Sequence, residues 1–534
     1  MESAIASPWS APLALTLVHV ILAALAFHEA PFNGGDDAAY ISLARSLMER
    51  HDYTNIWDPA LPPHTQYPPI FPIIVASGLL AGLSVDVGLK LMMLALSSAA
   101  VFASCVWLRR VTSPGIAFCA GFFIAISPEI ITLGREVLSD APFWLFSTLA
   151  LLAWYRADRD AAEAPDRRMP VRWVVFGTTA LIAAYFTRSA GVPLLVATIV
   201  WLALRRQPRA MAVVVGCSLP LILAWWLRGH SHGADGYLAP FLSVDPYNPS
   251  RGTVEAHDLG ARLWKNITRY ASRQIPRLVF GGPRSDVVLG TTICVAMLFG
   301  WVRRLRRPGL AEIWLPLYLG VVVLWPVTWG GPRFLLPIVP LIALYVGDAA
   351  GEIAKRTRYP AVVAAVLLLA GAWTVRPALT TTIALATACR EQYAEGGEFP
   401  CTESIFRDFY IAAQLTRGHL PEGSVVISRK PTLFFLYSGY RSQIYPLFAR
   451  PDSLFNLADR IGAKYVVVDQ ISDLAPRYLH PILLARRDDF CVMPEMSRPD
   501  AVLLRIEIDG PPRAPGSPPN AFRRCDAAPV SALK

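Results

Sequence analysis

The stretch FNGGDDAAYISLARSLMERHDY, residues 32–53, follows closely on an apolar stretch at residues 9–27. Two glycines break the chain before Asp36 and Asp37, and apolar side chains then recur every three or four residues. This spacing predicts an amphipathic helix whose apolar stripe suits a membrane surface. The pattern therefore predicts a chain that crosses a membrane and then places two carboxylates at the start of a surface helix.

The composition also indicates a membrane protein. Hydrophobic residues make up 54% of the 534 residues and charged residues only 17%, against roughly 25% charged residues in a typical soluble domain. The net charge of +10 does not indicate a nucleic-acid partner, because most arginines cluster in short gaps between apolar stretches rather than on a soluble face.

Eleven apolar stretches are predicted to be transmembrane helices, three of them short or weak. Residues 68–84 are also apolar but begin with three prolines, and only about a dozen residues remain beyond the last one, too few to span. We therefore predict an interfacial or re-entrant helix there. The predicted spans are residues 9–27, 88–108, 114–131, 141–155, 173–187, 190–204, 210–227, 287–302, 311–327, 333–347 and 360–375.

Basic residues divide unevenly between the two sides of this arrangement. Five alternate gaps hold seventeen Lys and Arg, whereas the short gaps on the other side hold essentially Arg135, Arg188 and Arg333. The positive-inside rule makes the first side cytoplasmic. We therefore expect a multi-pass protein of the inner or plasma membrane, with a cytoplasmic N-terminus. The loops 28–87 and 228–286 and the C-terminal part then face outside.

Residues 376–510 are predicted to form a small extracytoplasmic α/β domain. The β-branched runs at 423–428 and 463–470 are typical of buried strands, and helical stretches flank them. Residues 511–534 are Pro-rich at their start and are expected to be a disordered tail. In an oxidising compartment the four cysteines of the C-terminal part have the number needed for two disulfides. They are Cys389, Cys401, Cys491 and Cys525.

The acidic pair has a structural and a catalytic interpretation. Aspartate is a favoured helix N-cap, so Asp36 or Asp37 can simply cap its helix. Two adjacent acids directly after a membrane exit also suit a general base that takes a proton from an acceptor hydroxyl. His51 and His64, further along the loop, are weakly indicated as metal ligands, and solvated loop histidines are the alternative.

Three arginines are predicted to share the outer face with these acids. A guanidinium group is well suited to holding phosphate, so we expect Arg135, Arg188 and Arg333 to bind a phosphate. The alternative is that each extends to the membrane interface without a catalytic role. Glu136 and Asp140 complete a charged cluster beside Arg135, and such a cluster between apolar helices usually faces a polar cavity.

Four segments together resemble the membrane-embedded GT-C glycosyltransferases. The most similar groups are the protein mannosyltransferases, the aminoarabinose transferases of lipid A and the bacterial RgtA/B/C/D-like enzymes. The order and spacing of the segments cover most of residues 12–350, and the first two are the more specific. The segments are GDDAAYISLARSLMERHDY (35–53), YPPIFPIIV (67–75), REVLSDAPF (135–143) and GGPRFLLPIVP (330–340).

The resemblance implies a GT-C catalytic domain over residues 1–375 and transfer of a sugar from a polyprenyl-phosphate carrier to an acceptor outside the cytoplasm. The family's first-loop acidic pair corresponds to Asp36 and Asp37, and its second-loop acid to Asp140. The pair is Asp-Asp where the family usually has Asp-Glu. The segment from Tyr67 lacks the lysine that aminoarabinose transferases carry there, which makes that specificity less expected.

The sequence-based hypothesis is a direct displacement at the anomeric carbon of the sugar, with one aspartate of the pair as base. Tyr40, Tyr67 and Glu136 are expected to contact substrate. No cofactor is expected, although the carboxylates offer oxygen ligands to a divalent cation. The acceptor is a glycolipid, a cell-wall polysaccharide or a protein. The alternatives are a transporter or flippase of a lipid-linked saccharide and a catalytically inactive scaffold with this fold.

Overall fold

The structure, a computed structural model, describes residues 9–31, 34–232, 237–282, 286–508 and 522–525. Contacts between residues divide the chain into two compact units, named here the helical unit and the α/β unit. The helical unit contains residues up to His28, Thr65–Pro246 and Arg251–Ala388. The α/β unit contains Glu29–His64, Tyr247–Ser250 and the chain from Cys389 onward. By contacts, the part of the predicted first loop from Glu29 to His64 therefore belongs with the C-terminal part of the chain.

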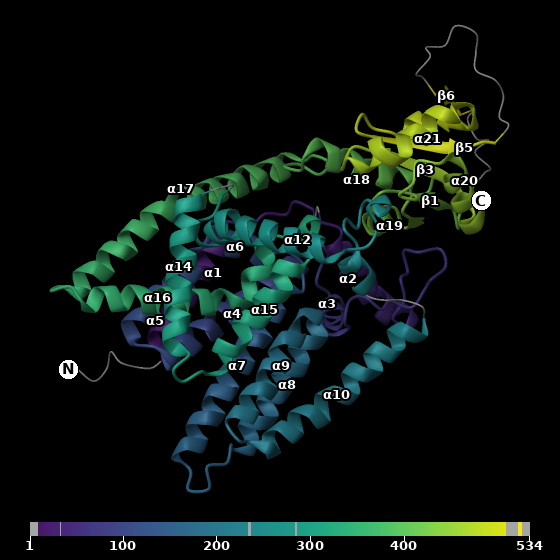
Figure 1. Ribbon diagram of the computed structural model, residues 1–534. Coiled ribbons are helices and arrows are strands. Elements are labelled where there is room, and N and C mark those ends of the chain that lie inside the picture. The colour runs from purple at the N-terminus through teal and green to yellow at the C-terminus, as the bar shows by residue number, and fades with distance from the viewer. Residues whose placement is uncertain (1–8, 32–33, 233–236, 283–285, 509–521, 526–534) are drawn as a thin grey trace. The chain divides into compact units, whose positions relative to one another are not determined.

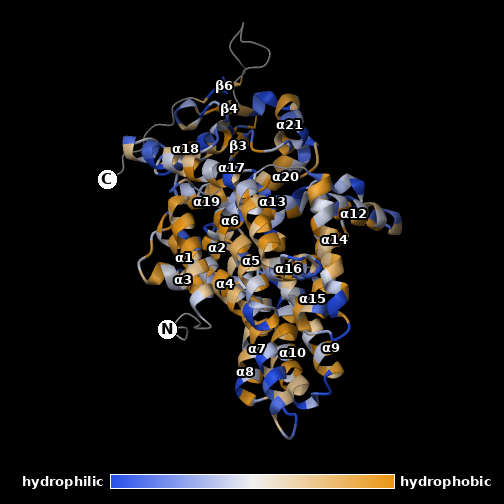
Figure 2. Ribbon diagram, turned by 90° about the vertical axis from the view of Figure 1, so that its left-hand side faces the viewer, coloured by the Kyte–Doolittle hydropathy of each residue, from blue (hydrophilic) through white to orange (hydrophobic). Residues whose placement is uncertain are grey.

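Helices make up nearly all of the helical unit (Figure 1). Apolar residues dominate their ribbons (Figure 2). Helices overlap each predicted span, although residues 114–131 contain two helices and residues 333–347 begin as a 3₁₀ segment. The longer helices are α1 (Ser10–Leu25), α3 (Ile70–Leu80), α4 (Gly88–Val111), α5 (Pro114–Ile126), α7 (Asp140–Glu163), α8 (Val171–Thr187), α9 (Val192–Leu204), α10 (Pro208–Ser231), α12 (Ala256–Arg269), α14 (Val287–Arg304), α15 (Leu310–Leu324), α16 (Val339–Lys355) and α17 (Pro360–Glu395). The shorter ones are α6 (Pro128–Gly134), α11 (Leu238–Leu242) and α13 (Ile275–Phe280).

Five helices of the described chain are long and apolar enough to cross a membrane, or six if the bent pair α5–α6 is one span. Five further apolar helices, among them α1 and α3, are shorter. The count of eleven spans stays a prediction. The eleven-residue α3 begins after Pro69 and contains the third proline, Pro72. Its interfacial placement also stays a prediction. Helix α17 continues to Glu395, beyond the predicted domain boundary at 375.

The prediction of one continuous helix over residues 114–131 was wrong. The helix breaks at Ser127, and α5 and α6 meet at a bend of 58°. A residue before proline is driven out of the helical conformation, and Ser127, which precedes Pro128, is extended. The Ser127 hydroxyl donates to Leu278 O at 2.5 Å and accepts the Ile130 amide, so the break is stabilised on both sides.

The core of the helical unit lies where α7 packs against α4 and α8. Trp144 and Trp154 of α7 are fully buried. A Cβ added to Gly177 of α8 would lie 2.8 Å from the Trp154 ring, so only glycine permits this close approach. Such packing is expected of helices that associate in a bilayer, where small residues let backbones come close.

The α/β unit contains a six-stranded mixed sheet in the order β2-β1-β3-β5-β4-β6. Strands β1, β2 and β3 are parallel, and β5 runs antiparallel to β3. The predicted strands and helices of this region are confirmed within a few residues. The elements are β1 (Val425–Ile427), β2 (Arg441–Gln443), β3 (Ala463–Asp469), β4 (Phe490–Val492), β5 (Ala501–Ile506), β6 (Arg523–Arg524), α18 (Ser404–Thr416), α19 (Pro431–Ser438), α20 (Pro451–Ile461) and α21 (His480–Ala485).

The chain passes from β1 to β2 on one side and then to β3 on the other side of β1. In open α/β sheets, ligands and polar side chains gather at the carboxyl ends of the strands where the order reverses in this way. Here that point lies between β1 and β3. The residues that follow these strands are therefore candidates for a functional role.

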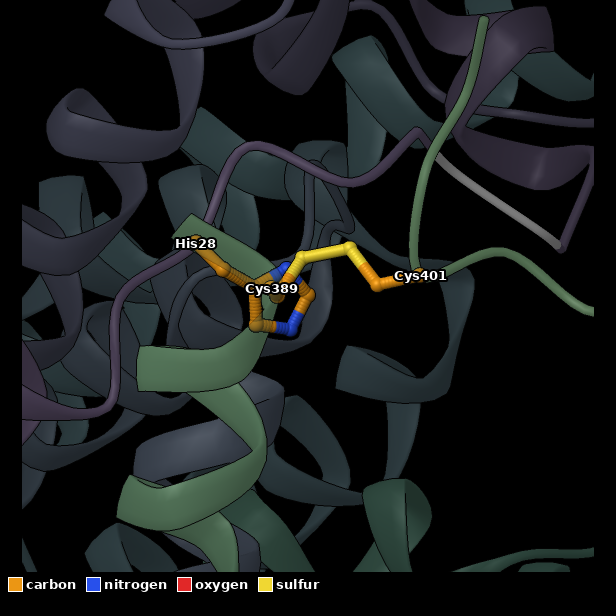
Figure 3. Close-up of side chains that lie close together, drawn as sticks. All are labelled: His28, Cys389 and Cys401. Atoms are coloured by element: carbon orange, nitrogen blue, oxygen red, sulfur yellow. A yellow bond between two sulfur atoms is a disulfide. The ribbon is translucent and has the colours of Figure 1, made fainter. Parts of the chain in front are cut away.

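Two disulfides link the four cysteines of the C-terminal part. Cys389 pairs with Cys401, as Figure 3 shows, and Cys491 pairs with Cys525. The second disulfide and strand β6 hold Phe522–Cys525, within the stretch expected to be a disordered tail, against β4. Residues 509–521 and 526–534 of that tail lie outside the described residues.

Candidate functional site

Helix α2 (Asp36–Arg45), in the α/β unit, carries the acidic pair at its start. Gly35 precedes it with a φ of +95°, a conformation that favours glycine. Asp37 is 2% exposed, and its Oδ1 accepts the backbone amides of Gly35 and Ala38, each at 2.8 Å. Asp37 thus supports the turn, whereas Asp36 is only half-buried. Tyr40 is buried in the same helix, and its contact with substrate stays a prediction.

Two side chains from the start of α19 hold this turn. Lys430 Nζ donates to Gly34 O at 2.7 Å, and Thr432 Oγ1 donates to Gly35 O at 3.0 Å. Lys430 lies three residues after the end of β1, at the carboxyl end of the parallel strands. Burial lowers the pKa of Lys430 from its ordinary value, Arg429 lowers it further, and Asp36 and Asp37 oppose the shift. Lys430 therefore holds the turn through a hydrogen bond and also places a positive charge near Asp36 and Asp37.

Replacing Lys430 by Met is expected to lower the rate of the sugar transfer that the sequence resemblance implies by about tenfold or more. The turn would lose a charge-assisted hydrogen bond, which contributes roughly 1.5–3 kcal/mol. Turnover by the purified full-length protein checks this. Lys464→Met removes an exposed lysine of the same unit and should leave turnover unchanged. Equal activity of both variants would contradict a role for Lys430.

Asp469 ends β3 at the same edge of the sheet. It is 1% exposed, its Oδ1 accepts the Ile471 amide at 3.0 Å, and its Oδ2 has no hydrogen-bond partner among the described residues. Burial raises the pKa of Asp469 to about 6, against the opposing effects of the Ile471 amide and the nearby cations Arg429 and Lys430. The buried carboxyl group is therefore neutral below that pH.

The raised pKa of Asp469 predicts a pH dependence of stability. Between about pH 4 and pH 6 the folded state keeps a proton that the unfolded state releases, so the free energy of unfolding falls as pH rises and levels off above pH 6. Asp469→Asn should flatten this slope in thermal unfolding of the full-length protein. Asp473→Asn, an exposed carboxylate paired with Arg477, is the control. An unchanged slope in Asp469→Asn would contradict the assignment.

Among the described residues, neither His51 nor His64 belongs to a cluster of possible metal ligands. His64 is buried, and its Nδ1 lies 2.6 Å from Asn55 Oδ1. His51 sits exposed at a left-handed turn. The groups of ligand atoms that do lie close together among the described residues each include the two sulfurs of a disulfide. A disulfide sulfur is not the thiolate that binds metals.

In the helical unit, Arg188 and Asp140 form an ion pair. Arg188 ends α8, and its Nη1 donates to Asp140 Oδ1 at 2.8 Å and to Ser139 Oγ at 3.3 Å. Asp140 is buried at the start of α7, and its Oδ2 has no partner among the described residues. The carboxylate therefore orients the guanidinium group, and Ser139 helps to fix it.

Arg188 and Arg333 both face the ring of Phe334. Their Cζ atoms lie 4.8 and 5.2 Å from the ring centroid. Tyr318 Oη donates to the Phe334 carbonyl at 2.8 Å, which holds this short 3₁₀ segment (Pro332–Ile338) in place. The structure thus brings two of the predicted phosphate ligands to one aromatic ring, with Asp140 beside them.

Arg135 makes different contacts from the other two arginines. Its Nη1 donates to Ala26 O, at the end of α1, at 2.5 Å, and its Nε lies 3.8 Å from Glu136 Oε1. Arg135 is buried, so these contacts suit an anchor for α1. Tyr67 is half-buried ahead of α3, and substrate contacts of Tyr67 and Glu136 stay predictions.

Lys430 and Phe334 were not identified from the sequence as site residues. Phe334 lies inside the segment with Arg333, but an aromatic residue in an apolar segment carries no functional signal of its own. Lys430 had a usable signal, because the basic pair Arg429-Lys430 directly follows the predicted strand 423–428. Charged residues at the carboxyl end of such strands often face ligands.

No protein-family model matches the chain, and no curated protein matches it in sequence. Solved structures do match in fold. The oligosaccharyltransferase of Archaeoglobus fulgidus in complex with Zn and sulfate is 13% identical over 90% of this chain and 71% of that chain, with a TM-score of 0.57. ArnT from Cupriavidus metallidurans in the apo state is 15% identical over 92% and 97% of the two chains, with a TM-score of 0.53.

Two further structures of these proteins contain a lipid phosphate. ArnT bound to undecaprenyl phosphate matches with a TM-score of 0.52 and 15% identity, over 94% of this chain and 98% of that chain. The Archaeoglobus fulgidus protein in complex with an inhibitory peptide and a dolichol-phosphate matches with a TM-score of 0.54 and 13% identity, over 90% and 72% of the two chains. The chain therefore has the fold of the GT-C membrane glycosyltransferases, as the sequence resemblance predicted.

Proposed function

We propose that the protein transfers a sugar from a polyprenyl-phosphate carrier to an acceptor hydroxyl outside the cytoplasm. The observation that carries this proposal is the pair of arginines, Arg188 and Arg333, that face one aromatic ring in a GT-C fold. Both guanidinium groups lie against one ring, and that of Arg188 is also paired with the buried Asp140. Such a pair suits a phosphate that gains charge during a reaction.

The chemistry is a direct displacement. The acceptor oxygen forms a bond to the anomeric carbon, and the bond between that carbon and the phosphate oxygen breaks, with its electron pair going to the phosphate. The hydroxyl proton passes to Asp36. Arg188 and Arg333 stabilise the departing polyprenyl phosphate, which needs no general acid because the phosphate oxygen leaves as an anion.

The remaining acids have supporting roles in this proposal. Asp37 is committed to two backbone amides, so Asp36 is the better general base. Asp140 orients Arg188 through their ion pair. Arg135, with its bond to Ala26 O, anchors the end of α1. The two disulfides fit an oxidising compartment for the α/β unit, in agreement with the predicted topology.

The proposal is tested with the purified protein in vesicles, a panel of radiolabelled polyprenyl-phosphate sugars, and a membrane extract as acceptor. Transfer of label by the wild type, abolished in the Asp36→Asn/Asp37→Asn double variant, is the expected result. A parallel sample with a chelator tests metal dependence, since one similar structure contains Zn. Movement of intact labelled lipid across the vesicle without transfer would instead favour a flippase.

A further inference from the structure

An arginine-lined cavity of about 540 Å³ lies within the helical unit. The C-terminal ends of α4, α9 and α14, the start of α15 and parts of α7 and α16 enclose it. Its basic residues all come from the gaps that the positive-inside rule assigns to the cytoplasm, the face opposite the proposed transfer reaction. The arginines that line it are Arg110, Arg205, Arg303, Arg304, Arg306 and Arg307.

Three of these six arginines are already paired with carboxylates. Ion pairs of this kind keep the guanidinium groups in fixed positions and cancel their charge locally. The pairs are Arg205 with Asp158 at 3.2 Å, Arg303 with Glu352 at 2.6 Å and Arg304 with Asp348 at 2.5 Å.

The other three arginines have no carboxylate partner among the described residues. The remaining acid of the lining, Glu312, accepts the Gly309 amide at 2.8 Å and the Tyr345 hydroxyl at 3.1 Å. Arg110, Arg306 and Arg307 therefore leave an excess of positive charge at the cavity. An anion with several acceptor oxygens would satisfy these donors, and phosphate fits a guanidinium fork better than most anions.

Apolar residues form much of the rest of the wall, among them Trp107, Trp201, Leu151 and Leu344. These four side chains are 0–2% exposed, so they close the back of the cavity and offer little surface to a ligand. The more exposed part of the lining consists mainly of the arginines. A ligand of this cavity is therefore held mainly through its charge, at the face of the helices where anionic headgroups lie.

We infer that this cavity binds the phosphodiester headgroup of an acidic membrane phospholipid. Basic pockets between helices at the cytoplasmic face of a membrane bind anionic headgroups in this way. The site is separate from the residues proposed for sugar transfer, so either proposal can fail without the other.

The test measures binding of dioctanoyl-phosphatidylglycerol to the purified full-length protein in a zwitterionic detergent at low salt. Removing two basic residues should weaken binding by roughly 30-fold, from about 1 kcal/mol for each. The variant Arg306→Gln/Arg307→Gln removes two exposed arginines of the cavity. Thermal unfolding of the variant should match the wild type.

The control Arg167→Gln/Arg168→Gln loses the same charge at the exposed link between α7 and α8, outside the cavity. It should bind the lipid within about twofold of the wild type. Equal loss in both double variants would show that only net charge matters and would overturn the site. Equally tight binding of pyrophosphate would overturn the lipid assignment, as would equally tight binding of dioctanoyl-phosphatidylcholine.

Discussion

Replacing Asp36 by Asn should lower kcat of sugar transfer at least about 100-fold, the lower end of general-base effects. Asparagine keeps the size of the side chain but cannot take the acceptor proton. Because Asp36 is half-buried and Asp37 supplies the bonds to the turn, thermal unfolding and the KM for the donor should stay close to wild type. Initial rates at saturating donor, with unfolding of the same sample, check both parts.

The variants of Asp37 provide the matched comparison. Asp37→Asn keeps an oxygen that can accept the two amides, so a moderate loss of activity is expected. Asp37→Ala removes that support and should cost about 1–3 kcal/mol of stability, because buried backbone amides lose their acceptor. If Asp37→Asn abolished turnover at normal stability while Asp36→Asn remained active, the assignment of the base would be reversed.

Replacing Arg188 by Gln is expected to lower kcat/KM by roughly 10²–10³-fold, as removal of one donor to a developing anion does. It also leaves the buried Asp140 without its ion-pair partner, and breaking a buried pair costs about 3–5 kcal/mol. Arg333→Gln should lower kcat/KM in the same direction with a smaller change in unfolding, because Arg333 is half-buried and faces the Phe334 ring.

A double-mutant cycle separates the two roles of Arg188. In Arg188→Met/Asp140→Leu both charges are gone, so much of the lost stability should return. Activity should not return, because the phosphate has lost a ligand. Recovery of both stability and activity would show that Arg188 serves the fold alone.

Much of the fold was predictable because its signals are local. Helices overlap all the predicted spans, although the span at 114–131 is broken, and the β-branched runs at 423–428 and 463–470 contain β1 and β3. The break at Ser127 was missed because apolarity alone cannot distinguish one helix from two. The sequence signal for this break was Pro128, near the end of the predicted span 114–131.

The contacts around the acidic pair were not predictable from local patterns. Lys430 and Gly34 are 396 positions apart in the chain, and nothing in either segment indicates the other. Periodicity predicted a helix start at Asp36, which is confirmed, but the N-cap residue is Gly35, so neither aspartate is the N-cap. The hydrogen bonds that the Gly35 and Ala38 amides donate to Asp37 distinguish the role of Asp37 from that of Asp36.

The most direct test of sugar transfer is a product balance with one defined polyprenyl-phosphate sugar. Mass spectrometry would measure the free polyprenyl phosphate released and the sugar gained by the acceptor, with wild type and the Asp36→Asn variant side by side. The proposed displacement predicts equal molar amounts of the two products for the wild type, and neither for the variant above background. Unchanged donor lipid in the presence of acceptor, or equal products from both proteins, would contradict it.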